Sequence, residues 1–261
     1  MEPAQQGEAL ELNRQGWDVV APRFYGGTAL PGYGPLAPTE DSLRLLPELR
    51  GARVLELGCG SGHSLAYCAE RGAAELWGLD LSQTQLDLAA TLLRERGHTA
   101  RLVQSPMERD PGLPAGHFDL VLSIYALGWT TDLGATLALV ARALRPGAHL
   151  VFSWEHPFYG CLAYEDGRVV LARSYCEEGP VRHEGFAGSS VPVVLQRRKL
   201  STYLNALTAA GLVLERLIEG EATPARARPQ DLDPEKWYSL PRARLMPTTF
   251  VIRAGKPTAA G

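Results

Sequence analysis

Residues 54–80 read VLELGCGSGHSLAYCAERGAAELWGLD, and this stretch decides the fold. A short apolar run at 53–57 ends in glycines, and the helix-forming segment 63–71 follows it. A second apolar run, 75–79, ends in the acidic residue Asp80. An apolar run, a glycine turn, a helix and a second apolar run are typical of a parallel β-α-β unit.

The same alternation of strand-like and helix-like segments continues toward the C-terminus. Ser82 is expected to cap a helix, and further helices are predicted at 133–144 and 199–210. The remaining strands are predicted at 100–103, 118–124, 148–154, 212–218 and 249–252. Strands separated by helices indicate an α/β fold with a largely parallel sheet and right-handed crossovers.

Length, charge and composition are those of an ordinary globular protein. The 261 residues suffice for one large core, and the net charge of -3 favours a small-molecule substrate over nucleic acid. The first fifteen residues hold no apolar run of the signal-peptide type, and no apolar stretch predicts a membrane span. The four cysteines form no C-x-x-C pair, which favours a cytoplasmic location, and no residue spacing indicates a metal site.

The glycine loop carries the first chemical signal. Its glycines follow the pattern G-x-G-x-G, with Glu56 two positions before Gly58, whereas nicotinamide and flavin sites have G-x-G-x-x-G. A carboxylate at this point repels a pyrophosphate and suits an ammonium or a sulfonium-bearing amino acid. Asp80, at the end of the next strand, is placed to accept hydrogen bonds from both hydroxyls of a ribose.

Four motifs together resemble those of class I S-adenosylmethionine-dependent methyltransferases: VLELGCGSG, WGLDLS, FDLVLSIYALGW and LRPGAHLVFS. The resemblance covers residues 50–155 and resumes at 199–254, and it is closest to small-molecule enzymes of the ubiquinone/menaquinone and natural-product type. It implies a Rossmann-like sheet of seven mostly parallel strands, with helices on both faces and an antiparallel last strand. A cap insertion is expected after the fifth strand.

The resemblance also suggests how the chain is divided. Residues 1–49 are expected to form a helical lid, and residues 50–154 a core that binds S-adenosylmethionine. Residues 155–198 hold too many apolar and aromatic side chains to stay solvated, so we interpret them as a substrate cap. Residues 199–261 are expected to complete the core.

The family pattern assigns a set of residues to the cofactor. The glycine loop is expected to hold the methionine part and Asp80 the ribose, while Leu81 either presses on the adenine or is a core leucine. Pro106 departs from the family pattern, which has an Asp there, so the Met107 backbone is expected to contact the adenine ring and either Glu108 or Gln104 its amine. The complete expected set is Glu56, Gly58, Cys59, Gly60, Asp80, Leu81, Met107, Glu108, Ser123 and Tyr25.

A second set is expected at the acceptor, just beyond the carboxyl ends of the fourth and fifth strands. Tyr125 and Trp129 are expected to form walls there, or else to pack in the core. His156 is a candidate base, or else it stabilises the turn before Pro157. The expected acceptor set is Trp129, Trp154, Glu155 and His156, with His156 and Tyr125 as catalytic candidates.

These features predict a methyltransferase that moves a methyl group from S-adenosylmethionine to N, O, S or C of a small molecule. The transfer is a direct displacement, for which the protein supplies mainly alignment and desolvation. Two alternatives stay open: an enzyme acting on tRNA or another macromolecule, and a protein that binds the cofactor without transferring the methyl group. We expect a monomer or a homodimer.

Overall fold

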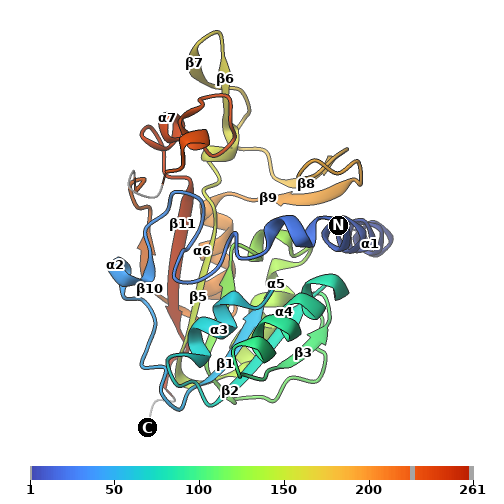
Figure 1. The fold of residues 1–261 in the computed structure, drawn as a ribbon, viewed down its shortest axis with the longest axis vertical. Coiled ribbons are helices and arrows are strands. Elements are labelled where there is room, and N and C mark those ends of the chain that lie inside the picture. The colour runs from blue at the N-terminus through green and yellow to red at the C-terminus, as the bar shows by residue number, and fades with distance from the viewer. Residues whose placement is uncertain (1, 224–226, 259–261) are drawn as a thin grey trace.

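The computed structural model describes residues 2–223 and 227–258 and contains a seven-stranded sheet in the order β10-β11-β5-β4-β1-β2-β3 (Figure 1). Strands β1 to β5 pair in parallel, and β11 is antiparallel to both of its neighbours. The predicted Rossmann-like fold with an antiparallel last strand is therefore confirmed. The strands are β1 (Arg53–Leu57), β2 (Glu75–Asp80), β3 (Arg101–Gln104), β4 (Phe118–Ile124), β5 (Leu144–Glu155), β10 (Val213–Ile218) and β11 (Thr249–Gly255).

Helices cover both faces of this sheet. Side chains on both sides of the central strands are therefore buried, and these strands do not alternate between apolar and polar residues. Leu55 and Phe152 pack in one cluster with α5 and α6, while the adjacent Val54 and Val151 pack in another with α3 and α4. These helices are α3 (His63–Ala69), α4 (Gln83–Glu95), α5 (Leu133–Ala143) and α6 (Leu200–Ala209).

The N-terminal segment forms α1 (Pro3–Val20) and the 3-10 turn η1 (Ala21–Phe24), followed by the short helix α2 (Glu40–Leu43). Helix α1 lies beside β9, where the Asn13 side chain donates to the Val194 carbonyl at 2.9 Å and accepts from the Val194 N–H at 2.7 Å. The Asn13 side chain is 1% exposed, so this pair fixes the helix from within its contact surface. The apolar positions of residues 8–25 predict an entry helix there. The observed helix starts earlier, at Pro3, a residue well suited to a first helical position.

The insertion after β5 folds into two hairpins outside the main sheet (Figure 1). Its elements are η3 (Tyr159–Cys161), β6 (Leu162–Glu165), β7 (Arg168–Leu171), β8 (Gly179–His183) and β9 (Val193–Arg197). Two strand-like runs in the sequence of the insertion, residues 168–173 and 191–196, correspond to β7 and β9. Strands β6 and β8 were not predicted. Both are short, and β8 begins with Gly179-Pro180, residues that are typical of turns.

The connection between β10 and β11 also approaches the carboxyl ends of the strands. Its described part contains η5 (Pro229–Leu232) and α7 (Leu240–Ala243), and η2 (Leu127–Trp129) follows β4. No helix within residues 2–223 and 227–258 is long and apolar enough to cross a membrane.

Candidate active site

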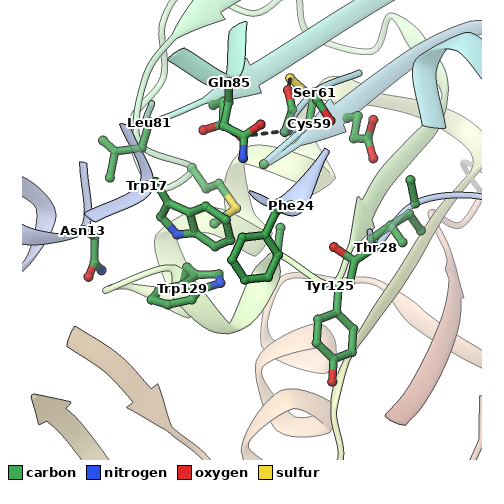
Figure 2. A pocket seen from close by; sticks show the side chains of 18 of the residues that line it. Asn13, Trp17, Phe24, Thr28, Cys59, Ser61, Leu81, Gln85, Tyr125 and Trp129 are labelled. Atoms are coloured by element: carbon green, nitrogen blue, oxygen red, sulfur yellow. Dashed lines mark hydrogen bonds between the residues drawn. The ribbon is translucent and has the colours of Figure 1, made fainter. Parts of the chain in front are cut away.

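A pocket lies where β1, β2 and β4 end, between the glycine loop and the N-terminal segment (Figure 2). We call it the loop pocket. Figure 2 shows Trp17, Phe24 and Trp129 gathered on one side, with Cys59, Ser61 and Gln85 on another. From the two predicted sets, the residues that line it are Glu56, Gly58, Cys59, Gly60, Asp80, Leu81, Met107, Glu108, Tyr125 and Trp129.

The glycine loop is shaped so that its backbone faces the pocket. Gly58 and Gly60 have φ values of +65° and +50°, a region that residues with a Cβ rarely adopt. A Cβ on Gly58 would also overlap the methyl group of Ala126. The Cys59 N–H donates to the Leu79 carbonyl at 2.9 Å, which ties the loop to the end of β2. Backbone groups can therefore approach a ligand closely at this point.

Asp80 is fixed at the floor of the loop pocket by two backbone donors. Its Oδ2 accepts from the Gly60 N–H at 2.8 Å, and its Oδ1 accepts from the Ser82 N–H at 2.9 Å. Burial raises the pKa of Asp80 to about 6, and these two hydrogen bonds oppose that rise. Each carboxylate oxygen has further acceptor capacity, so the geometry suits a pair of ligand hydroxyls.

Glu56 supplies a second buried acceptor in the loop pocket. The residue is 2% exposed, and its Oε2 has no hydrogen-bond partner among the described residues. Burial raises the pKa of Glu56 to about 8, while the Ser64 hydroxyl lowers it and the nearby Asp80 raises it further. A ligand ammonium would satisfy this oxygen and favour its ionised form.

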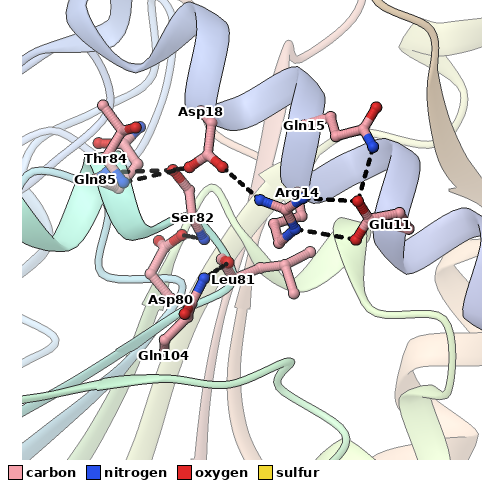
Figure 3. Close-up of polar contacts among 10 residues, drawn as sticks. All are labelled: Glu11, Arg14, Gln15, Asp18, Asp80, Leu81, Ser82, Thr84, Gln85 and Gln104. Atoms are coloured by element: carbon pink, nitrogen blue, oxygen red, sulfur yellow. Dashed lines mark hydrogen bonds and ion pairs between the residues drawn. The ribbon is translucent and has the colours of Figure 1, made fainter.

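Helix α1 is attached next to the loop pocket through Asp18 (Figure 3). The Asp18 Oδ1 accepts from the Ser82 hydroxyl at 2.6 Å and from the Thr84 N–H at 3.2 Å, at the start of α4. Its Oδ2 accepts from Arg14 at 2.9 Å. A carboxylate at a helix N-terminus is electrostatically favourable, so this contact stabilises the position of α1 beside the pocket.

Two predicted cofactor residues lie outside the loop pocket. Tyr25 is 45% exposed and packs edge-on against His63, with ring centroids 4.6 Å apart, so the aromatic ring that η1 brings to the pocket is its neighbour Phe24. Ser123 is fully buried inside β4, and the next residue, Ile124, faces the pocket instead. The alternation of side chains along a strand explains the difference at Ser123.

His156 is also placed differently from the catalytic position expected for it. The side chain is 4% exposed and lines neither the loop pocket nor the cavity beside it. Its Nδ1 accepts from the Phe158 N–H at 3.2 Å, which leaves Nε2 to donate to Glu219 at 2.7 Å. Both ring nitrogens are therefore engaged, and the geometry favours the alternative in which His156 stabilises the turn at Pro157.

A second, larger cavity adjoins the loop pocket beside the β8–β9 hairpin, and we call it the aromatic cavity. The predicted acceptor residues Trp129, Trp154 and Glu155 line it, as does Tyr125. Tyr175 and Phe186, two aromatic residues of the insertion that the sequence offers as cap-lining side chains, also line it. Sequence reasoning missed Trp237 and Tyr238 in its wall, because they come from the polar connection before β11.

Comparisons with known proteins identify the family. A family model described as "Methyltransferase domain" matches residues 55–152. A solved S-adenosylmethionine dependent methyltransferase from Mesorhizobium loti has 32% sequence identity and a TM-score of 0.68, covering 81% of this chain and 94% of that one. The chain belongs to the S-adenosylmethionine-dependent methyltransferases. Its methyl donor is S-adenosylmethionine, a nucleoside that carries an amino acid. The open backbone at Gly58 and the Glu56 oxygen without a partner among the described residues fit this ligand.

Two further relatives are similar to parts of this methyltransferase. An uncharacterized protein from Haemophilus influenzae is 31% identical over 191 residues, which are 68% of this chain and 73% of that protein. A ubiquinone biosynthesis O-methyltransferase from Aromatoleum aromaticum is 35% identical over 105 residues, or 40% of this chain and 44% of the enzyme. The chain thus spans less than half the length of the relative whose reaction is named.

The raised pKa of Glu56 gives this methyltransferase a testable pH dependence. A carboxyl whose pKa is higher in the folded than in the unfolded protein stabilises the fold at low pH, and this contribution is lost as the pH rises toward about 8. We expect the free energy of unfolding without cofactor to fall by on the order of 2 kcal/mol between pH 5 and pH 8. Urea denaturation should show a smaller fall for Glu56→Gln, and identical pH profiles for the two proteins would contradict the assignment.

Proposed function

We propose that the chain transfers a methyl group from S-adenosylmethionine to a small molecule held in the aromatic cavity. The observation that carries this proposal is the wall that the loop pocket and the aromatic cavity share. Trp17, Phe24, Tyr125 and Trp129 line both the loop pocket and the aromatic cavity. A donor in the first space therefore lies directly beside an acceptor in the second.

The proposal assigns roles to the residues of the loop pocket. Bound S-adenosylmethionine supplies an activated methyl group on a sulfonium. Asp80 would accept from the ribose hydroxyls, Glu56 would pair with the ammonium group, and Leu81 would pack on the adenine. Gly58, Cys59 and Gly60 would hold the methionine part with their backbone, and Met107 and Glu108 would lie at the adenine edge.

The remaining segments would exclude water from the reacting atoms. Residues 1–49 would act as the lid and residues 155–198 as the acceptor cap. Three rings from different segments support this, because Trp17 packs edge-on against Trp129 at 5.3 Å and against Phe186 at 5.2 Å. Such an enclosed aromatic wall suits a flat small molecule better than a polynucleotide.

The macromolecular alternative rests on one local basic set in the sequence, Arg226, Arg228, Arg242 and Arg244. Arg244 is exposed, but the other described members do not extend it into a basic surface. Arg228 is paired with Asp231 at 3.3 Å, and Arg242 is 4% exposed. Arg226, from the same set, lies outside the described residues. The name of the Aromatoleum aromaticum relative, an O-methyltransferase of ubiquinone biosynthesis, also favours a small acceptor.

Labelled methyl transfer tests the proposed function. The protein is incubated with methyl-labelled S-adenosylmethionine and either a panel of small phenols, amines and thiols or unmodified tRNA. We expect label in the small-molecule fraction and none in the tRNA. Label in the tRNA would overturn the proposal, as would cofactor binding by calorimetry without label transfer to any small acceptor.

A further inference from the structure

Three side chains form a hydrogen-bonded row along the wall of the aromatic cavity. The Tyr125 hydroxyl donates to the Tyr238 hydroxyl at 2.8 Å, and the Tyr238 hydroxyl donates to Glu155 Oε2 at 2.6 Å. All three line the aromatic cavity, and Tyr125 also lines the loop pocket. The row therefore starts where donor and acceptor would meet and ends on a carboxylate.

The backbone holds Tyr125 at this boundary. Tyr125 directly follows β4 with a φ of +57°, which is rare for a residue with a bulky side chain. Its N–H donates to the Ser153 carbonyl at 3.1 Å, and its ring packs against Trp154 with centroids 5.2 Å apart. Such backbone strain is kept where the surrounding structure enforces it, and it is frequent at functional sites.

Glu155 fixes the direction of the row. Besides the Tyr238 hydroxyl, its Oε2 accepts from the Trp237 indole N–H at 2.6 Å, so the carboxylate receives two donors. Tyr238 has only one proton to donate and gives it to Glu155, so it must accept from Tyr125. Tyr125 in turn gives its proton to Tyr238, and its own oxygen, which the Thr249 side chain also approaches, can accept from a ligand hydroxyl.

The charge around Glu155 suits the receipt of a proton. Burial raises the pKa of Glu155, while the two hydrogen bonds and the nearby Arg173 lower it. Burial also raises the pKa of Tyr125 and of Tyr238 well above the usual range, so neither phenol stays ionised after passing a proton on. A proton entering the row therefore comes to rest on Glu155.

We propose that Tyr125, Tyr238 and Glu155 form a proton relay for an acceptor whose reacting oxygen carries a proton, and that the acceptor is a small hydroxylated aromatic molecule. This inference rests on the proposed function. As the acceptor oxygen forms its bond to the methyl carbon, the carbon–sulfur bond of the donor breaks and its electron pair stays on sulfur. The acceptor proton passes to Tyr125, the Tyr125 proton to Tyr238, and the Tyr238 proton to Glu155. Tyr125 is the catalytic residue of this row, and Tyr238 and Glu155 act through it.

Two probe acceptors that differ in one atom test the relay. 4-Methylphenol must lose a proton on methylation, whereas 4-methylbenzenethiol is largely ionised near neutral pH and needs no base. We expect Tyr125→Phe and Glu155→Gln to lower kcat/KM for the phenol by about 100-fold, the usual scale of general base catalysis. The thiol should react with wild-type kinetics in both variants.

Tyr33→Phe is the matched control. The Tyr33 hydroxyl donates to Glu40 at 2.6 Å in another buried tyrosine–glutamate pair, but neither residue lines the two spaces. This variant should keep wild-type rates with both probes. Equal losses with phenol and thiol in the relay variants, or no loss with either, would overturn the relay and leave the proposed function intact. If the wild-type protein released S-adenosylhomocysteine with neither probe, both the relay and its acceptor class would be overturned.

Discussion

Replacing Asp80 with Ala is expected to weaken binding of S-adenosylmethionine by about 100-fold or more. The change removes the proposed acceptor of the ribose hydroxyls, and hydrogen bonds to a charged group contribute about 1.5–3 kcal/mol each. It also removes the carboxylate that holds the Gly60 and Ser82 N–H groups, so the loop loses its fixed position. Isothermal titration calorimetry with S-adenosylhomocysteine measures the effect without any acceptor.

Asp87→Ala is the control for Asp80→Ala. Asp87 lies on α4 close to the same pocket, is exposed, and accepts from the Gln83 side chain at 2.8 Å. Its removal should leave the dissociation constant unchanged. Asp80→Asn keeps the size of the side chain and should bind weakly while remaining folded. Wild-type affinity in a folded Asp80 variant would refute the ribose assignment.

Replacing Gly58 with Ala is expected to damage both stability and cofactor binding. A Cβ at φ +65° costs about 1–2 kcal/mol, and overlap with a packed neighbour adds about 1–3 kcal/mol. The neighbour is Ala126, which itself lines the loop pocket, so the overlap is transmitted to the ligand space. Urea denaturation and calorimetry with S-adenosylhomocysteine should both register the change.

Gly51→Ala separates the two causes. Gly51 has a φ of +77°, but a Cβ there would meet no atom within 4 Å. The variant should lose only the part of the stability that comes from backbone conformation, and it should bind the cofactor normally. Equal effects on affinity at Gly51 and Gly58 would mean that the contact with Ala126 is not what shapes the pocket.

The sequence predicts the central sheet and the pocket for the methyl donor well, because both depend on short local motifs. The apolar run before Gly58 and the acidic end of the strand at Asp80 each follow from a few adjacent residues. Parallel strands then bring these separate motifs to one edge of the sheet. The fold, the family and the cofactor could therefore be inferred before the structure was known.

The acceptor side depends on contacts between distant segments, which no local pattern reveals. Tyr238 lies in a polar connection, and only the fold brings it next to Tyr125, 113 residues away in sequence. His156 has two interpretations from the sequence alone, and only the structure shows its partner Glu219. In the N-terminal segment Phe24 lines the loop pocket and the predicted Tyr25 does not, because adjacent residues of a tight turn direct their side chains differently.

A crystal structure with S-adenosylhomocysteine bound tests the central claim most directly. We expect the ribose hydroxyls to bind Asp80, the amino group to lie near Glu56, and the sulfur to face Tyr125 and the aromatic cavity. A ribose bound away from Asp80, or a sulfur directed toward another opening, would contradict it.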